Sequence, residues 1–270
     1  MKKITKKIAA ISILLILSVG ALISCGESSE AFELYQQMME NMANVESLNM
    51  DMTSTINMDM TELMGMTLTM VTTGNIRQVM RSETDIDMAM DLTTSMMGET
   101  TSMMMYFRNG VLYTEMEMFG EVMRYSMPMP LEELLAEGGG GMDDLIDFDE
   151  DAIKDFSISR QDGNKRIEFT LDGNAINDLM DQVMAQLEEF ELTDDDTIIE
   201  IGDVTMEVVI DANGMLQFYR MIADMEITVD GESFSMSMDT VMTVNSYNDV
   251  TITFPDDLDE WEPLDMSWMF

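Results

Sequence analysis

Residues 48–60 read LNMDMTSTINMDM, and this stretch decides the fold. Its even-numbered positions are apolar, with Ser54 as the exception, and its odd-numbered positions are all polar. Side chains alternate between the two faces of a β-strand, so the segment predicts a strand with one apolar and one solvated face. The same alternation returns as far as Phe254. The chain is therefore expected to form a large sheet with one methionine-rich face.

The hydrophobic pattern predicts about eleven strands joined mainly by hairpins, and hence an antiparallel sheet. The strongest hairpin signal is Asn109-Gly110, because this dipeptide adopts the positive φ angles of a tight turn. Another turn is expected at Met97-Gly98, and Pro128 should end a strand. We also expect a strand at Val204–Ile210 and a last one at Val250–Phe254.

Three or four helices are expected beside the sheet. Glu30–Val45 carries aromatic and methionine side chains at helical spacing, and Asn174–Phe190 has the clearest apolar helical stripe. A shorter helix is expected at Leu131–Glu137, followed by four glycines at 138–141 that indicate a flexible loop. Asp147–Asp151 imitates the start of an EF-hand loop, but the Gly and Glu that the motif needs are replaced by Ala152 and Ile158. No metal site is predicted.

The composition is strongly acidic. The chain has 270 residues, 46% of them hydrophobic, and a formal net charge of -40. Such a surface repels nucleic acid and tolerates a cationic partner. Histidine is absent, which removes the most common general base and metal ligand. We therefore expect neither an enzyme nor a cofactor, and we expect the protein to act as a monomer.

The N-terminus has the features of an export signal. Residues 1–7 are basic, residues 8–21 are apolar, and Leu22-Ile23-Ser24-Cys25 follows. This last motif resembles the lipobox of bacterial lipoproteins. The resemblance implies cleavage before Cys25 and a diacylglyceryl group on that cysteine. Because Cys25 is the one cysteine in the sequence, no disulfide forms within the chain.

The lipobox resemblance sets the expected location and the domain boundaries. Two acyl chains give stable anchoring, and a tether over residues 25–29 reaches at most about 17 Å. The body should therefore lie on the outer face of the cell membrane, or at the outer membrane in a cell with two membranes. We expect a signal peptide at 1–24, a single domain at 30–255 and an acidic tail at 256–270. The tail carries Trp261 and Trp268 and is expected to fold back onto the body.

The order of elements also resembles a known family. A lipobox, a tether and an amphipathic helix precede alternating strands, then Asp162-Gly163-Asn164, Ile167–Leu171, a helix, and a final Val250–Pro255. This order resembles the LolA/LppX/LprG-like lipoproteins, above all their poorly characterised Gram-positive relatives. The resemblance implies a mainly β, α+β fold in which an antiparallel half-open barrel wraps around three or four helices. It also implies a hydrophobic cavity that carries a lipid or acyl chain. The abundance of methionine, 36 residues, departs from the family.

On this reading, alternating apolar side chains line the cavity. The residues expected there are Met50, Met52, Met58, Met60, Met88, Met90, Met103, Met105, Phe107, Met225, Ile227, Met236 and Met238. Two alternatives remain: a sensor or interaction module that needs no cavity, and buffering of oxidants or copper by methionine. Thioethers do accept Cu(I), but these methionines are spread over the whole predicted sheet.

Overall fold

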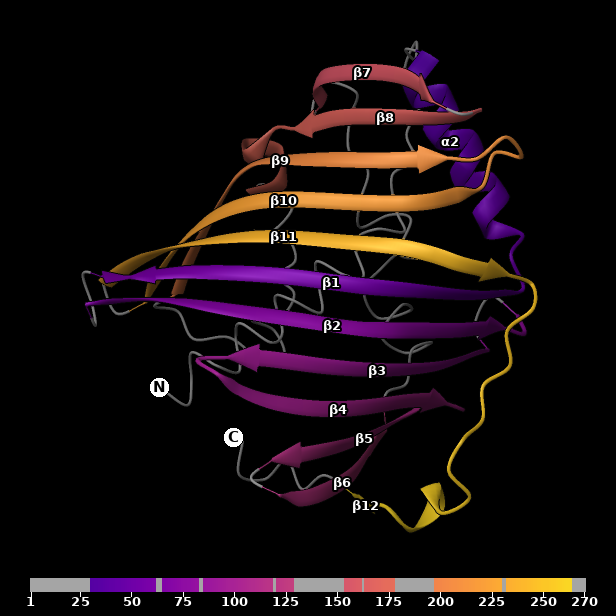
Figure 1. The fold of residues 1–270 in the computed structure, drawn as a ribbon, viewed down its shortest axis with the longest axis vertical. Coiled ribbons are helices and arrows are strands. Elements are labelled where there is room, and N and C mark those ends of the chain that lie inside the picture. The colour runs from indigo at the N-terminus through magenta and orange to yellow at the C-terminus, as the bar shows by residue number, and fades with distance from the viewer. Residues whose placement is uncertain are drawn as a thin grey trace.

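The computed structural model describes residues 30–61, 65–82, 85–118, 120–128, 153–161, 163–177, 197–229 and 232–263. In these residues a single twelve-stranded sheet curves strongly without closing (Figure 1). Helix α2 (Glu30–Ala43) lies at one end of it, beside β7 and β8. The expected mainly β fold, with a large antiparallel half-open sheet, is confirmed.

The strands follow a simple order. They are β1 (Ser47–Met60), β2 (Met66–Met80), β3 (Ile86–Met96), β4 (Glu99–Arg108), β5 (Val111–Met118), β6 (Glu121–Pro128), β7 (Ile153–Gln161), β8 (Asn164–Leu171), β9 (Thr197–Ile210), β10 (Leu216–Val229), β11 (Glu232–Tyr247) and β12 (Glu262–Pro263). Their order in the sheet is β12-β6-β5-β4-β3-β2-β1-β11-β10-β9-β8-β7. All neighbours are antiparallel except β12 and β6.

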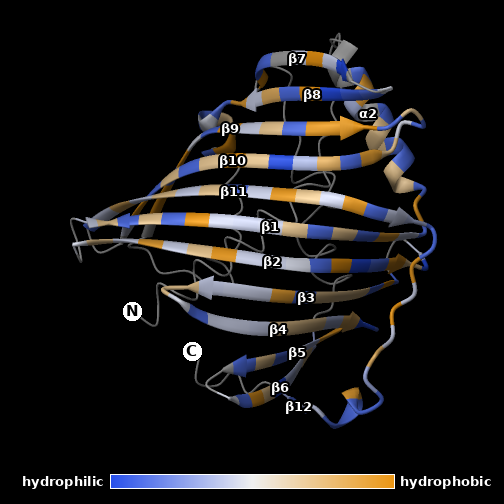
Figure 2. Ribbon diagram, in the orientation of Figure 1, coloured by the Kyte–Doolittle hydropathy of each residue, from blue (hydrophilic) through white to orange (hydrophobic). Residues whose placement is uncertain are grey.

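Strand β1, which contains the 48–60 stretch, lies in the middle of the sheet. It pairs with β2 on one side and with the distant β11 on the other, so it joins the N-terminal strands to the C-terminal ones. Met52, Ile56, Met58 and Met60 on this strand are buried, whereas Asp51, Thr53, Asn57 and Asp59 between them are exposed. The alternation therefore predicted the two faces of this strand correctly. Figure 2 shows the banding of polar and apolar residues along the strands.

Tight turns fix the register of the hairpins. Asn109 and Gly110 have φ angles of 52° and 71°, and Met97 and Gly98 have φ angles of 54° and 86°. Two consecutive positive φ angles match the twist of the flanking strands, which is why glycine occupies the second position in both turns. Both predicted hairpins are confirmed.

Helix α2 packs on the face of the sheet that carries Met52 and Ile56, which we call the inner face. Tyr35 and Met38 are buried in the same hydrophobic cluster as the strands, and the Tyr35 ring meets the Phe169 ring edge-on at 5.7 Å. This burial raises the pKa of Tyr35. The side-chain amide of Asn41 donates a hydrogen bond of 3.0 Å to the carbonyl of Gly214, which holds the helix to the β9–β10 turn.

The predicted start of one strand and the predicted last strand were wrong. Strand β9 begins at Thr197 rather than Val204. The alternation did not reveal this start, because a bulge near Gly202 shifts the register and interrupts the pattern. Val250–Phe254 is not a strand. Asn248, with a φ angle of 56°, turns the chain away from the sheet after β11. The short strand β12 was not predicted, since two residues are too few to show a pattern.

Several predictions fall outside the described residues. They are the signal peptide, Cys25 and the tether at 1–29, the helix at 131–137, the glycine run at 138–141, the acidic segment at 147–151 and Trp268. Of the helix expected at 174–190, the structure describes residues up to 177, and 173–177 are helical. Across the described part of the chain, no helix has the length and apolarity needed to cross a membrane.

Candidate functional site

The residues predicted to line a cavity lie on the inner face, but they differ in burial. The buried ones are Met52, Met58, Met60, Phe107, Met225, Ile227, Met236 and Met238. The partly exposed ones are Met50, Met88, Met90, Met103 and Met105, which pack against the edge of the main hydrophobic cluster. Strand register brings many of them together directly, as in the pairs Met58–Met236, Met225–Met236 and Met90–Met105.

Burial divides the inner face into two halves. In the half formed by β8–β11, which we call the packed half, nearly every inner-face side chain is buried, for example Phe169, Val208 and Met225. In the half formed by β2–β6, the open half, most inner-face side chains are partly exposed. These are Leu68, Met70, Met88, Met90, Met103, Met105, Leu112, Met116, Met123 and Met127. Leu92 and Phe107 are among the few in this half that are buried.

A row of hydroxyl groups runs across the strands of the inner face, from β11 in the packed half to β3 in the open half. Ser54 lies opposite Thr240 on one side and Thr72 on the other, and Thr72 lies opposite Thr94. The Ser54 and Thr240 hydroxyls are 2.9 Å apart, as are those of Thr72 and Thr94. These pairs satisfy polar groups that would otherwise face an apolar surface. The sequence signalled the row only through Ser54 and Thr240, which interrupt the alternation.

The opposite, outer face of the sheet is covered in one place by residues 248–263, which we call the strap. Leu258 and Trp261 of the strap form a second hydrophobic cluster with Ala89 and Tyr106. Trp261 meets the rings of Tyr106 and Tyr113 at 6.2 and 6.0 Å. The expectation that the acidic tail folds back onto the body is therefore confirmed for Trp261, whereas the second cluster was not predicted.

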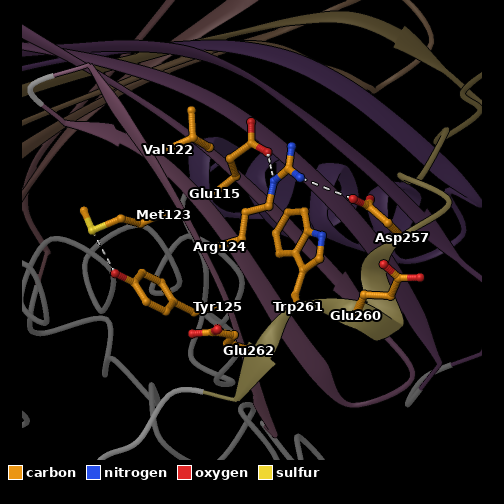
Figure 3. A pocket seen from close by; sticks show the side chains of 9 residues that line it. All are labelled: Glu115, Val122, Met123, Arg124, Tyr125, Asp257, Glu260, Trp261 and Glu262. Carbon is orange, nitrogen blue, oxygen red and sulfur yellow. Dashed lines mark hydrogen bonds and ion pairs between the residues drawn. The ribbon is translucent and has the colours of Figure 1, made fainter.

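Two surface hollows are lined by both polar and apolar side chains. One, of about 660 Å³, lies at the β6 edge beside the strap (Figure 3). There the Arg124 Nε donates to Glu115 at 2.6 Å, and an Nη of Arg124 lies 3.2 Å from Asp257. The hydrogen bond to Glu115 is the main reason why the pKa of Arg124 is raised. Its charge is thus already balanced by carboxylates of the chain.

The second hollow, of about 880 Å³, is lined by polar residues of the central strands and by apolar ones, among them Ile199, Met225 and Met236. Its carboxylates belong to Asp59, Glu200, Asp224 and Glu226. Glu200 and Glu226 lie directly opposite each other in the ladder. Among the residues that the structure describes, no three His, Cys, Asp or Glu side chains gather as a metal site.

Comparisons with known proteins place the chain in a family. A family model described as "Family of unknown function (DUF6612)" matches residues 30–260. No curated protein matches the sequence.

Two solved structures are similar at low identity. LprF from Mycobacterium bovis is 13% identical with a TM-score of 0.43, over 85% of this chain and 97% of LprF. A β-barrel-like protein of a domain of unknown function, DUF1849, from Brucella abortus is 14% identical with a TM-score of 0.22. That match covers 75% of this chain and 100% of the other. At these TM-scores neither likeness carries a functional inference, so the function is inferred from the geometry of this chain.

Proposed function

The chain belongs to the DUF6612 family, whose function is unknown, and we propose that it is a membrane-anchored lipoprotein that binds a hydrophobic ligand. The ligand is a lipid or an acyl chain, and it lies against the open half of the inner face. One observation carries the proposal: the inner-face methionines of β3 and β4 are partly exposed, whereas their counterparts on β10 and β11 are buried.

The hydrophobic effect supports a ligand at this place. Covering apolar surface is favourable by about 0.8 kcal/mol for each buried CH₂ group. The methionines of β3 and β4 form a continuous apolar area. Met90 lies opposite Met105, and Met88 and Met103 are the next inner-face residues along their strands. An acyl chain laid on this area removes water from both surfaces.

The residue type also suits a variable ligand. Methionine is unbranched and polarisable, so its side chain adapts to irregular shapes. The hydroxyls of Thr72 and Thr94 lie beside the methionines and form a hydrogen bond of 2.9 Å with each other. Because each hydroxyl has two acceptor lone pairs, this pair can also engage a polar group at the end of an acyl chain.

The expected location completes the proposal. Cys25, if lipidated as its lipobox resemblance implies, would hold the body close to a bilayer. The source of a lipid would then lie within a short distance of the body. No catalytic step is required, and we propose a binding or carrier protein rather than an enzyme.

Lipid binding can be tested directly. The purified protein should release lipid on organic extraction and mass spectrometry, and after delipidation it should bind a fluorescent fatty acid. The double variant Met90→Gln/Met105→Gln places two amides on the open half and should weaken binding about tenfold, since burying an unpaired amide is costly. Met97→Gln is the matched control, because Met97 is 69% exposed in a turn. If no lipid co-purifies and the delipidated protein does not bind the probe, the proposal is wrong.

A second proposed role, the buffering of oxidants, rests on the exposure of two methionines. Met96 and Met97 are 40% and 69% exposed, and thioether oxidation needs only access to the oxidant. Buffering of oxidants by surface methionine is therefore compatible with lipid binding. It predicts that peroxide converts Met96 and Met97 to the sulfoxide before Met225 or Met236, which peptide mass spectrometry can follow.

A further inference from the structure

Strand β6 forms an edge of the sheet that is only partly covered. Among the described residues, its partner on the side away from β5 is β12, which pairs with Tyr125 and Ser126 alone. The preceding residues, Glu121–Arg124, pair with β5 on one side and with no described strand on the other. A strand edge of this kind presents unpaired N–H and C=O groups, and it can therefore accept another strand.

The hollow of about 660 Å³ beside the strap follows this free edge (Figure 3). Its lining includes the consecutive residues Val122–Tyr125. Side chains of consecutive strand residues point to opposite faces, so the hollow reaches both faces and runs along the edge itself. Val122 is 56% exposed there, although it is apolar. The molecule thus has space for an added strand and an apolar side chain for it to cover.

The charges around the hollow favour a basic occupant. Arg124 is already paired with Glu115 at 2.6 Å and with Asp257 at 3.2 Å. Glu260 and Glu262 also line the hollow, and neither makes an ion pair within the described part of the chain. One guanidinium group therefore faces four carboxylates, and the hollow keeps an excess of negative charge.

We propose that the free edge of β6 binds an extended, basic peptide segment of a partner protein. The segment adds a strand beside Glu121–Arg124, and its backbone pairs with the free N–H and C=O groups. One of its apolar side chains covers Val122, and its Lys or Arg side chains reach Glu260 and Glu262. A second copy of the chain is disfavoured as the occupant, because the net charge of -40 opposes self-association. Four strand residues span about 14 Å, so the contact is short and the complex dissociates readily.

This surface is separate from the proposed lipid site. It consists of the β6 edge and the strap, whereas the lipid is proposed to lie on the inner-face methionines of β3 and β4. The variant Met90→Gln/Met105→Gln should therefore bind the peptide as the wild type does. Either proposal can fail without the other.

The test titrates a labelled hexapeptide of alternating lysine and valine, blocked at both ends, into the purified protein at constant ionic strength. Fluorescence anisotropy should show binding to the wild type. Glu260→Gln/Glu262→Gln should weaken binding roughly three- to tenfold, as expected for the loss of two exposed ion pairs. The matched control is Glu200→Gln/Glu226→Gln, which removes the same charge from the β9–β10 ladder and should leave the affinity unchanged.

Two further arms test the strand edge itself. The same hexapeptide N-methylated at every residue keeps its charges but has no backbone N–H to donate, so it should bind at least about tenfold more weakly. Val122→Lys places a positive charge on the edge and removes the apolar contact, and it should weaken binding by a similar factor. Its matched control is Ile198→Lys, which adds the same charge at a position of β9 that is 59% exposed.

Amide hydrogen exchange locates the occupant. The amides of Glu121–Arg124 that point away from β5 should exchange quickly in the free protein and slowly with the peptide bound. The proposal is overturned if the wild type does not bind, if the methylated peptide binds equally well, or if both double variants lose the same affinity. It is also overturned if these amides are already protected in the free protein. Such protection would place a segment of the chain itself on the edge or, if Val122→Lys dissociates a dimer in sedimentation, a second copy.

Discussion

The packed half and the open half of the inner face follow the same sequence rule but differ in exposure. Both place apolar side chains at alternate positions, and both use methionine heavily. Yet Met221, Met225 and Met236 are buried, while Met90, Met103 and Met105 are partly exposed. Alternation therefore determines which face a side chain joins, whereas its burial depends on what covers that face.

The composition of the two halves differs as well. The packed half mixes methionine with β-branched and aromatic residues such as Ile167, Val208 and Phe169, which have few rotamers and pack tightly. Helix α2 adds Tyr35 against Phe169. In the open half, methionine itself forms most of the apolar surface between β3 and β4. A stiff region that stabilises the fold thus lies beside an adaptable region that can accommodate a ligand.

Truncating one methionine in each half should show the largest difference. Met225→Ala removes a side chain that is 4% exposed, so it should lower the free energy of unfolding by about 2–5 kcal/mol. Met90→Ala removes the same atoms from a partly exposed position and should cost less than half as much. Urea denaturation of the two delipidated variants gives both values. Equal costs would mean that the two halves are packed alike.

The sequence was sufficient for the sheet and its faces, but not for what lies over them. The 48–60 stretch predicted β1 correctly, and Asn109-Gly110 predicted its turn, because both depend on local stereochemistry. The β9 bulge near Gly202 disturbs the local alternation, so the start of that strand was missed. Trp261 packs on Tyr106 across more than a hundred residues of chain, and no local pattern encodes such a contact.

The candidate sites show the same limit. The alternation assigned Met90 and Met225 to one face, but their different burial depends on long-range packing. The pairing of Ser54 with Thr240 depends on the register between β1 and β11, which the intervening chain does not reveal.

The hydroxyl row allows a second comparison, with a smaller expected effect. Thr240→Val changes a position that is 2% exposed, and it should cost about 1–3 kcal/mol because the partly buried Ser54 hydroxyl loses its partner. The double variant Ser54→Ala/Thr240→Val should cost less than the sum of the single variants. Thr94→Val, in the open half, should cost under about 1 kcal/mol, since water can replace the lost hydroxyl as the partner of Thr72.

The measurement for this row is again urea denaturation of the variants. A cost for Thr94→Val as large as that for Thr240→Val would show that the open half excludes water as fully as the packed half. Strictly additive costs for Ser54→Ala and Thr240→Val would show that the 2.9 Å contact between the two hydroxyls contributes no coupling energy.

The smallest effect is expected on the outer face of the packed half, at the ion pair between Arg220 and Asp239. Hydrogen bonds from Arg220 are the largest cause of the lowered pKa of Asp239. A carboxyl whose pKa is lower in the folded state stabilises the fold above its unfolded pKa, about 3.9, and this contribution is lost as the pH falls through the folded pKa. Both side chains are 40% exposed, so solvent screening should keep the contribution below about 1 kcal/mol.

The variant Asp239→Asn isolates this contribution, because its amide does not titrate. Melting temperatures of wild type and variant between pH 7 and pH 2 should differ most above pH 5 and converge in acid. Asp259→Asn, at an exposed position in the strap, is the control and should follow the wild type throughout. A difference between wild type and Asp239→Asn that persists unchanged at pH 2 would mean that the aspartate acts through packing or neutral hydrogen bonds. The ion pair would then contribute nothing to the stability of the packed half.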